Sequence, residues 1–536
     1  MSRLRRSYGG RGSWQARLPA AMALAAALAL AGFAVTRGTW AVGGSDSSCY
    51  ALMAEAFGSG RWQPSSTLAV EAPWPDASRT LAPGGFIPSP VRPDAASPVC
   101  APGYAVLMAP FYAAGGRDAV FAITPIAAFV LVWCAFVLAN RLAGGLAGVS
   151  AALLTATSPI VLFQAVQPMN DIATAALWLA ALVVSIRLKA DATSGHLATA
   201  KVVSRTTLAG VLVGLAILVR PNLAPLAVVV AAMHWQPGQP PPFRASALLA
   251  LGALPGVAGM LWLNRVLYGS VSGSGYGDVG QLFRLSHVAT NLPNYWTAFY
   301  QTQTVFPLLA LAAPFVLTGQ ARRAALWLLA LAAAVVGTYL LYRPHPEWWY
   351  LRFLIPALVV MIILACSVAA WAADRARMRG VMAIGTVVLA LLSIRAAGTR
   401  DVLALQAQEG RYRETAALVS ERLPASAVLI TVWQSGSVRF HAGREAVLWD
   451  SLDPAWLDRA VAWLTAQGRP PYILLERREE GEFRDRFRGH AAIGALDWPP
   501  RFNVGGQARI FDPMDRSRYL AGEGYPTEST RPPRRR

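Results

Sequence analysis

The stretch "LRFLIPALVVMIILACSVAAWAADRARMR", residues 351–379, decides the fold class of this chain. Residues 351–372 are apolar apart from Arg352 and a few small polar side chains, and three arginines follow by residue 379. The hydrocarbon core of a bilayer is about 30 Å thick and takes about 20 such residues as a helix. Arginines directly after an apolar run are typical of its cytoplasmic end. The stretch therefore predicts a transmembrane helix.

Ten further apolar segments indicate a polytopic α-helical membrane protein. Of the 536 residues, 55% are hydrophobic and 14% are charged, a composition too apolar for a soluble enzyme of this size. The sequence predicts about eleven transmembrane helices, at residues 18–35, 119–139, 144–163, 172–186, 208–219, 223–235, 245–267, 305–317, 324–341, 351–372 and 381–394. The first segment resembles a signal peptide, but the ten that follow favour an uncleaved helix.

The basic charge of the chain, +19 overall, is distributed as in membrane proteins and not as on a nucleic-acid-binding surface. With the N-terminus in the cytoplasm, the cytoplasmic loops hold sixteen Lys and Arg against two acids, Asp191 and Asp374. The positive-inside rule then places the C-terminal part outside. We expect a bacterial inner-membrane protein with a cytoplasmic segment at 1–17, a transmembrane core at 18–397 and a first periplasmic loop at 37–118.

The carboxylates of the transmembrane part lie on its outer side. Asp171 is the most informative, because "SPIVLFQAVQPMNDIATAALWLAAL" places it between two apolar runs with almost no loop. An ionised group at mid-bilayer costs roughly 3 kcal/mol or more, so an acid in this position usually faces a water-filled cavity. The alternative is a solvated turn residue, since "PMND" is also common in turns.

A short helix is predicted in the first outer loop, where "GGSDSSCYALMAEAFGSGRW" spans residues 43–62. Asp46 or Ser47 is its expected N-cap, and Gly58 and Gly60 its expected end. Tyr50 shares a helix face with Asp46 at 100° per residue. Asp46 is therefore either a functional carboxylate above an apolar strip or simply the cap.

Two arginines are expected near the outer surface. "GVLVGLAILVRPNLAPLAVVV" holds Arg220 between two short apolar segments, which predicts a turn below that surface. A guanidinium there can bind a phosphate in bidentate fashion, although extension toward lipid headgroups is the alternative. In "YRPHPEWWYLRFLIPAL", His345 lies at an aromatic rim, and Arg352 falls inside the apolar run and should point into the bundle.

Other motifs narrow the classes of function. "NRVLYGSVSGSGYGDVG" is a Gly/Ser-rich loop around Tyr276, and its glycines permit close approach of a ligand, though alone this is weak evidence. Neither lysine of the chain follows a P-loop, which disfavours a nucleotide-driven motor. The six histidines include no HExxH pair, which disfavours a zinc hydrolase.

In order along the chain, "YALMAEAFGSGRW", "QPMNDIATAALWLAAL", "LAILVRPN", "LNRVLYGSVSGSGYG" and "WWYLRFLIPAL" resemble the GT-C membrane glycosyltransferases. The likeness is to the bacterial family 39-like branch, related to protein O-mannosyltransferases and the lipid A aminoarabinose transferase, and covers residues 18–372. It implies inverting transfer of a hexosyl or pentosyl group from a polyprenyl-phosphate carrier to a glycan, lipid or protein acceptor at the outer face.

The resemblance also assigns expected roles to individual residues. Asp46 would be the general base, and Asp171 would support the site or bind a divalent cation. Arg220 and Arg352 would hold the carrier phosphate, with Tyr276, His345 and Tyr50 as further substrate-binding candidates. The chain departs from many relatives by having "SDSS" in place of two adjacent acids, and Asp171 has no second acid two residues away. A tightly bound metal is therefore not expected.

Two cysteines, Cys49 and Cys100, lie in the first outer loop, where an oxidising compartment allows a disulfide. Two free thiols are the alternative. The loop between Pro64 and Pro102 is rich in proline and is expected to be irregular.

Residues 398–515 are predicted to form a periplasmic α/β domain of parallel-sheet type. "YRETAALVSERL" and "PAWLDRAVAWLTAQG" read as helices, and "AVLITVW" and "YILLE" as strands. Residues 516–536 are predicted to be disordered. The domain shows no catalytic pattern, and acceptor recognition or simple capping remain open as its role.

Two other classes of function remain possible at this point. A transporter or flippase for a lipid or polar substrate would use Asp171 and Arg220 along a path, but such proteins usually contain internal repeats, and none is evident. A non-catalytic envelope scaffold does not account for polar residues gathered at shallow depth. Convergence of Asp46, Asp171, Arg220 and Arg352 on one outward cavity would favour the glycosyltransferase.

Overall fold

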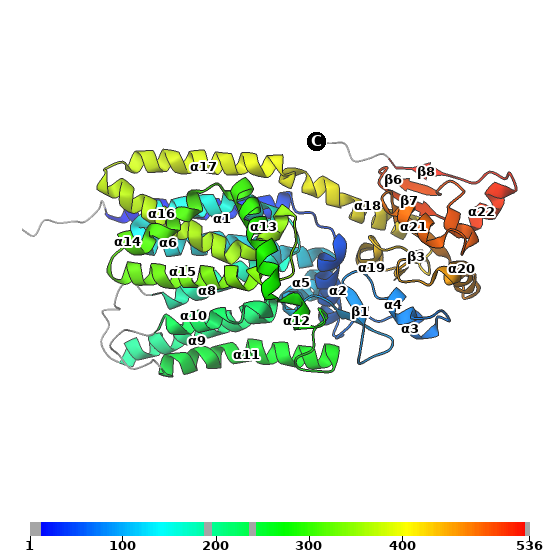
Figure 1. The fold of residues 1–536 in the computed structure, drawn as a ribbon, viewed down its shortest axis with the longest axis horizontal. Coiled ribbons are helices and arrows are strands. Elements are labelled where there is room, and N and C mark those ends of the chain that lie inside the picture. Colours follow the sequence, from blue (N-terminus) through cyan, green and yellow to red (C-terminus); the bar gives the residue numbers. More distant parts are fainter. Residues whose placement is uncertain (1–11, 187–195, 235–242, 531–536) are drawn as a thin grey trace, which may run out of the picture.

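In a computed structural model of the chain, long helices run side by side in a bundle, and a smaller domain of strands and short helices lies at one end of it (Figure 1). The structure describes residues 12–186, 196–234 and 243–530. Several predicted cytoplasmic charges, among them Asp191 and Lys189, lie outside these residues. Helix α2 and the strands of the first loop lie between the bundle and the C-terminal sheet (Figure 1).

The protein is a multi-pass membrane protein. Six helical stretches in the described part of the chain are long and apolar enough to cross a bilayer. They contain the helices α1 (Gly12–Thr36), α6 (Ile123–Thr157), α11 (Phe243–Tyr268), α15 (Gly319–Leu340), α16 (Ile355–Arg375) and α17 (Arg379–Thr399). A seventh is the pair α7 (Pro159–Ala165) and α8 (Asn170–Ser185), which is bent by 114°.

In the described part of the chain, these six stretches, or seven with the bent pair, are fewer than the eleven predicted segments. Three of the predicted segments fold as shorter apolar helices. The first is Val203–Val219, within α9 (His196–Val219). The second, Pro221–Ala232, includes η2 (Pro221–Leu223) and α10 (Leu226–Ala232), and the third, Phe306–Val316, includes η4 (Phe306–Ala312) and α14 (Ala313–Val316). Each of these apolar stretches is shorter than the ~20 residues that a span requires, although α9 as a whole has 24 residues.

Helix α6 contains two arms, because its backbone is non-helical at Ala143 and Gly144. A Cβ added to Gly148 would meet the ring of Phe136 at 2.8 Å, whereas twelve residues of one continuous helix span about 18 Å. The arms before and after Gly144 thus double back on each other. This break separates the predicted segments 119–139 and 144–163.

Helix α16, the stretch that opened the sequence argument, is the centre of the bundle and is buried along most of its length. Helix α17 is mostly exposed, with apolar side chains such as Ile384 and Leu391 on its surface. An apolar exposed face of this kind is expected of a helix that contacts lipid.

The first loop is more regular than its proline content suggests. Helix α2 (Gly44–Gly58) lies where the sequence predicts it and ends at the predicted glycine. It is followed by α3 (Leu68–Glu71), α4 (Ala77–Thr80), the antiparallel pair β1 (Phe86–Pro88) and β2 (Ala96–Pro98), and α5 (Gly103–Ala119). The predicted N-cap is wrong, because Gly43 occupies that position and Asp46 lies inside the first turn.

The C-terminal domain contains a mixed six-stranded sheet and not the parallel sheet that was predicted. Its strands are β3 (Val428–Ile430), β4 (Glu445–Val447), β5 (Pro471–Glu476), β6 (Phe502–Val504), β7 (Ala508–Phe511) and β8 (Glu528–Ser529), in the order β4-β3-β5-β7-β6-β8. The first three are parallel, whereas β7 is antiparallel to β5 and β6. Gly505 and Gly506, both with positive φ, form the tight β6–β7 turn.

Helices surround this sheet and connect it to the bundle. They are α18 (Leu405–Arg422), which follows α17, then α19 (Ser435–Ala442), α20 (Leu457–Ala466), α21 (Glu479–Phe487) and α22 (Pro513–Leu520). The predicted disorder of 516–536 is corrected as far as residue 530, because α22 and β8 lie there and β8 pairs with β6. Residues 531–536 lie outside the described part.

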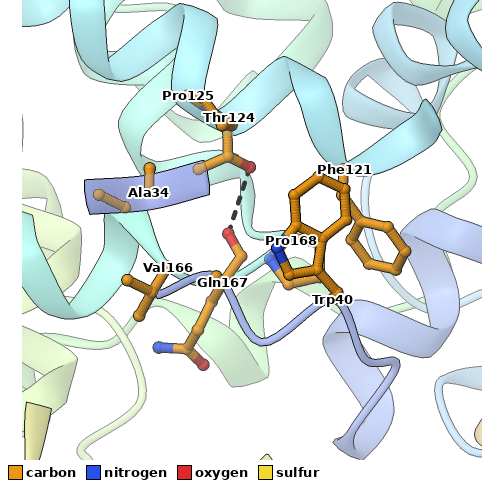
Figure 2. A pocket seen from close by; sticks show the side chains of 10 residues that line it. Ala34, Trp40, Phe121, Thr124, Pro125, Val166, Gln167 and Pro168 are labelled. Carbon is orange, nitrogen blue, oxygen red and sulfur yellow. Dashed lines mark hydrogen bonds between the residues drawn. The ribbon is translucent and has the colours of Figure 1, made fainter. Parts of the chain in front are cut away.

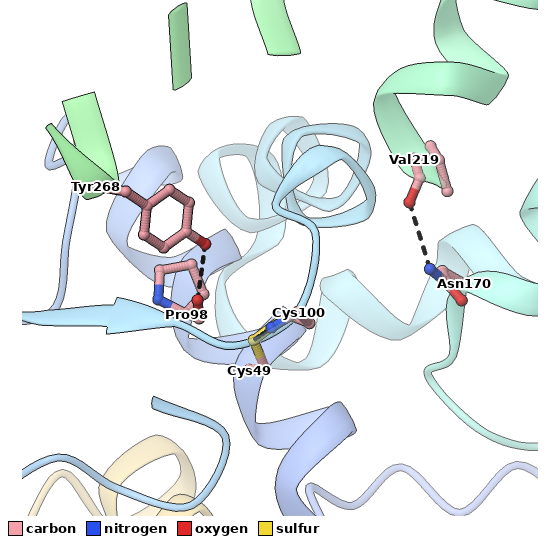
Figure 3. The surroundings of a disulfide bond; sticks show 6 residues. All are labelled: Cys49, Pro98, Cys100, Asn170, Val219 and Tyr268. Carbon is pink, nitrogen blue, oxygen red and sulfur yellow. Dashed lines mark hydrogen bonds between the residues drawn. A yellow bond between two sulfur atoms is a disulfide. The ribbon is translucent and has the colours of Figure 1, made fainter. Parts of the chain in front are cut away.

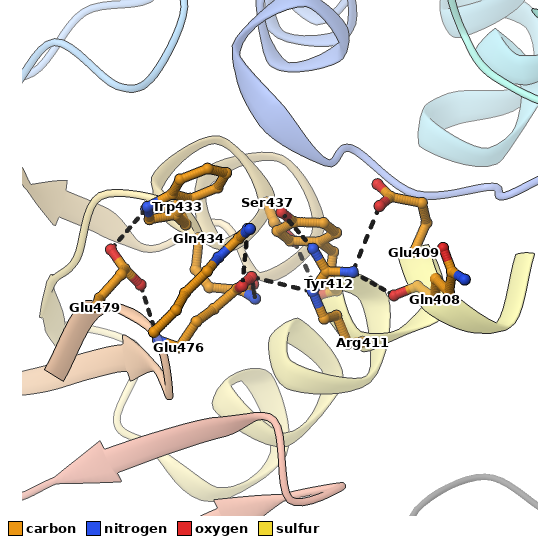
Figure 4. A network of polar contacts seen from close by, with 10 residues as sticks. Gln408, Glu409, Arg411, Tyr412, Trp433, Gln434, Ser437, Glu476 and Glu479 are labelled. Carbon is orange, nitrogen blue, oxygen red and sulfur yellow. Dashed lines mark hydrogen bonds and ion pairs between the residues drawn. The ribbon is translucent and has the colours of Figure 1, made fainter. Parts of the chain in front are cut away.

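A polar network fastens α18 to the sheet (Figure 4). Arg411 donates from Nε to Glu476 on β5 at 3.1 Å, and Gln434 donates to the same carboxylate at 3.2 Å. The network therefore ties α18, which follows α17 after a short turn, to strand β5.

Candidate active site

Asp171 and Arg220 form a buried ion pair inside the bundle. Arg220 Nη2 lies 2.7 Å from Asp171 Oδ1 and 2.8 Å from Asn170 Oδ1. Asp171 is 1% exposed and Arg220 is 8% exposed. Asp171 therefore does not face an open, water-filled cavity, as the sequence suggested, but neutralises an arginine.

Local backbone geometry places both partners. Arg220 ends α9 in an extended conformation (φ −143°, ψ 84°), which is expected of a residue that precedes a proline. Asn170 begins α8 and donates from Nδ2 to the carbonyl of Val219 at 3.3 Å (Figure 3). The amide of Asn170 thus links the start of α8 to the end of α9.

The turn before α8 is held by the chain that follows α1. Thr124 donates to the carbonyl of Gln167 at 3.2 Å, and Trp40 packs on Phe121 with ring centres 5.6 Å apart (Figure 2). A cavity of about 10 Å³ remains there, which holds at most one water molecule. The sharp bend that positions Asp171 is therefore a packed structural feature and not a ligand site.

Asp46 and Arg352 form a second and more accessible ion pair. Arg352 Nη2 lies 2.8 Å from Asp46 Oδ2, with side chains 12% and 41% exposed respectively. Arg352 lies in η5 (Trp348–Leu354), immediately before α16, and Asp46 in the first turn of α2. The pair thus joins the first loop to the central helix of the bundle.

Phe353 brings the two pairs together. The guanidinium carbons of Arg220 and Arg352 lie 5.3 and 5.1 Å from the centre of the Phe353 ring. The two carbons are therefore within about 10 Å of each other. Cation–π contacts of this length stabilise each arginine. The structure therefore gathers Asp46, Asp171, Arg220 and Arg352 at one place.

Both arginines keep hydrogen-bonding capacity. Arg220 Nη1 and Arg352 Nε are buried and have no hydrogen-bond partner among the residues that the structure describes. A buried donor without a partner costs roughly 1–3 kcal/mol, so such atoms are candidates for ligand contacts.

Three further candidates lie around this cluster. Tyr50 is 4% exposed, and burial raises its pKa well above the usual value, with Tyr276, Asp46, Arg220 and Asp171 in electrostatic range. Tyr276 is 43% exposed as a whole residue, and desolvation of its hydroxyl, followed by the charge of Asp46, raises its pKa. Both hydroxyls are thus held neutral beside the charged groups.

His345 lies at the rim of the cluster, not at its centre. Its ring stacks on Tyr350 with centres 3.9 Å apart, and Tyr350 in turn lies 5.2 Å from the guanidinium carbon of Arg352. Burial lowers the pKa of His345. His345 therefore contacts the arginine site through an aromatic ring.

Sequence reasoning did not identify Asn170, Tyr339 or Phe353 as parts of this arrangement. Tyr339 is 2% exposed, with its ring centre 5.9 Å from the guanidinium carbon of Arg220. Asn170 is adjacent to Asp171 in "PMND", and Phe353 to Arg352 in "LRF", so both had a local signal. Nothing local indicates which arginine pairs with which acid.

Cys49 and Cys100 form a disulfide, with Cα atoms 6.2 Å apart (Figure 3). Cys49 lies on α2, one turn after Asp46, and Cys100 follows β2. Tyr268 at the end of α11 donates to the carbonyl of Pro98 at 2.7 Å (Figure 3). The disulfide thereby anchors the helix that carries Asp46 to a loop that is itself tied to the bundle.

Solved structures of two membrane enzymes have similar folds. ArnT from Cupriavidus metallidurans, bound to undecaprenyl phosphate, matches 89% of this chain and 95% of its own, with a TM-score of 0.58 and 15% identity. The oligosaccharyltransferase of Archaeoglobus fulgidus in the apo form matches 94% of this chain and 75% of its own, with a TM-score of 0.52 and 14% identity. The chain has the GT-C fold.

The GT-C resemblance seen in the sequence is thus confirmed at the level of the fold. Because the likeness to ArnT covers 89% of the chain, it extends beyond the GT-C bundle into the C-terminal domain. No protein-family model matches the sequence, and no curated protein does.

Proposed function

We propose that this protein is an inverting glycosyltransferase that moves a sugar from a polyprenyl-phosphate carrier to an acceptor hydroxyl at the outward face of the membrane. The observation that carries the proposal is Arg352, whose Nη2 holds the carboxylate Asp46 while its buried Nε has no partner in the described residues. One guanidinium can therefore contact a base and a donor phosphate together. The GT-C fold, shared with an ArnT structure bound to undecaprenyl phosphate, supports a carrier of this class.

The reaction assigns each bond to a group of the site. Asp46 takes the proton of the acceptor hydroxyl, whose oxygen attacks the anomeric carbon of the donor sugar from the face opposite the phosphate. The bond between that carbon and the phosphate oxygen breaks, and its electron pair stays on the phosphate. Arg352 and Arg220 stabilise the negative charge that develops there. A phosphate leaving group needs little protonation, so a second carboxyl acting as an acid is unnecessary.

Asp171 has a supporting role in this proposal. It keeps the buried Arg220 charged and oriented, leaving Arg220 Nη1 for the carrier phosphate. Tyr50, Tyr276 and His345 are proposed to line the donor and not to transfer protons.

The side chains present do not fit a resident divalent cation. Within the described ranges, no group of three or more His, Cys, Asp or Glu residues is close enough to share a metal. One oxygen of Asp171 is also bound by Arg220. The reaction is therefore written without a metal.

The proposed orientation follows the distribution of cations, with the N-terminus in the cytoplasm and the C-terminal domain in the periplasm. A reporter enzyme that is active only outside the cytoplasm, fused after Arg536, should be active in cells. An inactive fusion, with a cytoplasmic reporter active at the same position, would reverse the assignment.

Asp46→Asn should abolish transfer by removing the base while keeping an acceptor for the Arg352 hydrogen bond. We expect a loss of about 10²–10⁴ in turnover, measured as carrier phosphate released by the purified protein in lipid nanodiscs from a panel of radiolabelled polyprenyl-phosphate sugars. Asp118→Asn, at an exposed ion pair with Arg413, is the matched control and should retain full turnover.

Unchanged turnover in Asp46→Asn would exclude Asp46 as the base. Absence of carrier phosphate release from the wild type with every donor and acceptor in a broad panel would contradict the proposed activity itself.

A further inference from the structure

A cavity of about 310 Å³ lies between the first loop and the C-terminal domain, within the ~300–1,000 Å³ usual for small-molecule sites. Its polar lining comprises Ser45, Asp46, Arg79, Asp450 and Ser451. Ser45 and Asp46 lie on α2, Arg79 on α4, and Asp450 and Ser451 in the turn after β4. Figure 1 shows α2 and α4 beyond the end of the bundle, on the side of the C-terminal domain.

We propose that this cavity is the acceptor subsite and that it binds a neutral, polyhydroxylated head group such as a sugar. The inference rests on the proposed function, which it deepens, since it assigns the C-terminal domain a direct part in recognising the acceptor. Asp46 connects the two halves of the site, because it lines this cavity and also holds Arg352 beside the phosphate-binding cluster.

Two of the three charged residues that line the cavity, Arg79 and Asp450, are exposed and form no ion pair with a described residue. The Arg79 guanidinium has no hydrogen bond or ion pair with any described residue, and Asp450 accepts only from Ser451, at 3.1 Å. Arg79 donates and Asp450 accepts, so together they match the acceptor and donor capacity of sugar hydroxyls. The ion pair with Arg352 leaves Asp46 with one further oxygen for a hydroxyl proton.

Electrostatics favours a neutral ligand over an anionic one. Two carboxylates, Asp46 and Asp450, line the cavity with one cation, Arg79, and Arg352 balances Asp46 from beside the cavity, so the site carries no net positive charge that would attract an anion. A phosphate-bearing head group would place its negative charge next to both carboxylates, which is unfavourable in a partly enclosed site.

The walls of the cavity are held in place. The carbonyl of Thr80 accepts from Leu448 N across the two parts of the chain at 2.6 Å, and Ser435 Oγ accepts from Gly84 N at 3.0 Å. Gly85 has a positive φ of 88°, and a Cβ there would lie 2.2 Å from the carbonyl of Ser45. The loop can approach Asp46 this closely only with glycine at that position.

The test measures binding of small probes to the full-length protein in nanodiscs, without any donor. The probes are the methyl glycosides of glucose, galactose and mannose and the 6-phosphate of each, detected by saturation-transfer NMR and titrated to a Kd. We expect at least one neutral glycoside to bind, and the Kd for its 6-phosphate to be at least tenfold higher. Arg79→Gln and Asp450→Asn should each raise the Kd for the neutral glycoside at least fivefold.

Matched controls are Arg61→Gln in the same loop and Asp485→Asn in the same domain, both exposed and outside the cavity, which should bind as the wild type does. Asp450→Lys should reduce the difference in Kd between the neutral glycoside and its 6-phosphate. An unchanged Tm of this variant would show that the domain is intact. Binding of no neutral glycoside, equal binding of the phosphates, or wild-type affinity in both cavity variants would overturn the inference.

Failure of this inference is distinguishable from failure of the proposed function. Glycoside binding that depends on Arg79 and Asp450, without transfer from any donor, would support the subsite and contradict the transferase. Transfer with an acceptor KM unchanged in both variants would support the transferase and contradict the subsite.

Discussion

The two arginine–carboxylate pairs differ in how much water reaches them, and that difference separates their roles. Asp46 is 41% exposed and borders a cavity, so it can meet an acceptor. Asp171 is 1% exposed; its Oδ1 accepts from Arg220, and its buried Oδ2 has no hydrogen-bond partner among the described residues. In the proposed reaction, a carboxylate with that burial acts through the arginine that it holds.

Replacing Asp171 should therefore affect stability before chemistry. Asp171→Asn leaves the Arg220 charge buried without its counter-ion, and breaking such a pair costs roughly 3–5 kcal/mol. The Tm in nanodiscs should fall well below that of Asp94→Asn, a control at an exposed pair with Arg92.

The double variant Asp171→Leu with Arg220→Met separates the two roles, because replacing both charges by apolar groups can restore stability. We expect a Tm near that of the wild type and no release of carrier phosphate. An active double variant would remove Arg220 from the proposed phosphate site.

Polarity at the margins of apolar runs selected Asp46, Asp171, Arg220 and Arg352 as candidates, and the structure places these four residues close together. Their pairing could not be predicted, because Arg352 and Asp46 are separated by 306 residues and Arg220 and Asp171 by 49. The N-cap prediction for Asp46 failed because α2 begins two residues earlier, at Gly44, which places Asp46 in the first turn.

At the scale of helices and strands, hydropathy identified the apolar segments but not how far each one runs. The break at Ala143 and Gly144 divides α6, and Arg220–Pro221 ends α9. Length decides whether a segment spans, and it depends on breaks set by packing. In the sheet, Gly505 and Gly506 are typical of a β-hairpin turn. The prediction of a parallel sheet did not take this pair into account.

The disulfide between Cys49 and Cys100 is the main covalent constraint on α2. With a sequence separation of 51 residues, loop-closure entropy gives it about 4 kcal/mol of stabilisation. Cys49→Ser, Cys100→Ser and the double variant should all lower the Tm, by similar amounts. Reductant should lower the Tm of the wild type toward the same value and leave the double variant unchanged.

Equal Tm values in the wild type and the double variant would show that the disulfide does not stabilise α2. Alkylation mass shifts with and without reductant provide the control that the bond is formed in the purified protein.

At the scale of the molecule, the C-terminal domain contacts the first loop through a hydrogen bond that requires a neutral histidine. Val42 N donates to His441 Nε2 at 3.2 Å, and the His441 ring lies parallel to Phe121. Burial, followed by the positive charge of Arg413, lowers the pKa of His441 to about 4, with Asp118 opposing and Arg117 adding to the shift. Protonation of Nε2 would remove its bond to Val42.

Docking should therefore weaken in acid. An unfolded histidine titrates near pH 6.5, so as the pH falls from about 6.5 to about 4 the unfolded state binds the proton first and stability decreases. The Tm of the wild type should fall across this window relative to that of His441→Gln, which can still accept from Val42. Other titrating groups, such as Glu479, whose pKa is raised to about 7 by burial, are common to both proteins and cancel in the difference.

A Tm difference between the two proteins that is the same at pH 4 and pH 7 would contradict this assignment.

The backbone contact between Thr80 and Leu448 also has a consequence for biosynthesis. Ribosomes deliver the first loop long before residues 432–451, yet both are needed to enclose Asp46. A nascent or truncated chain can thus bring Arg220 and Arg352 together while the neighbouring cavity still lacks the side that the C-terminal domain contributes. The cavity beside Asp46 is therefore complete only after residues 432–451 have been synthesised and have docked on the first loop, so folding of the C-terminal domain sets when the proposed acceptor subsite is formed.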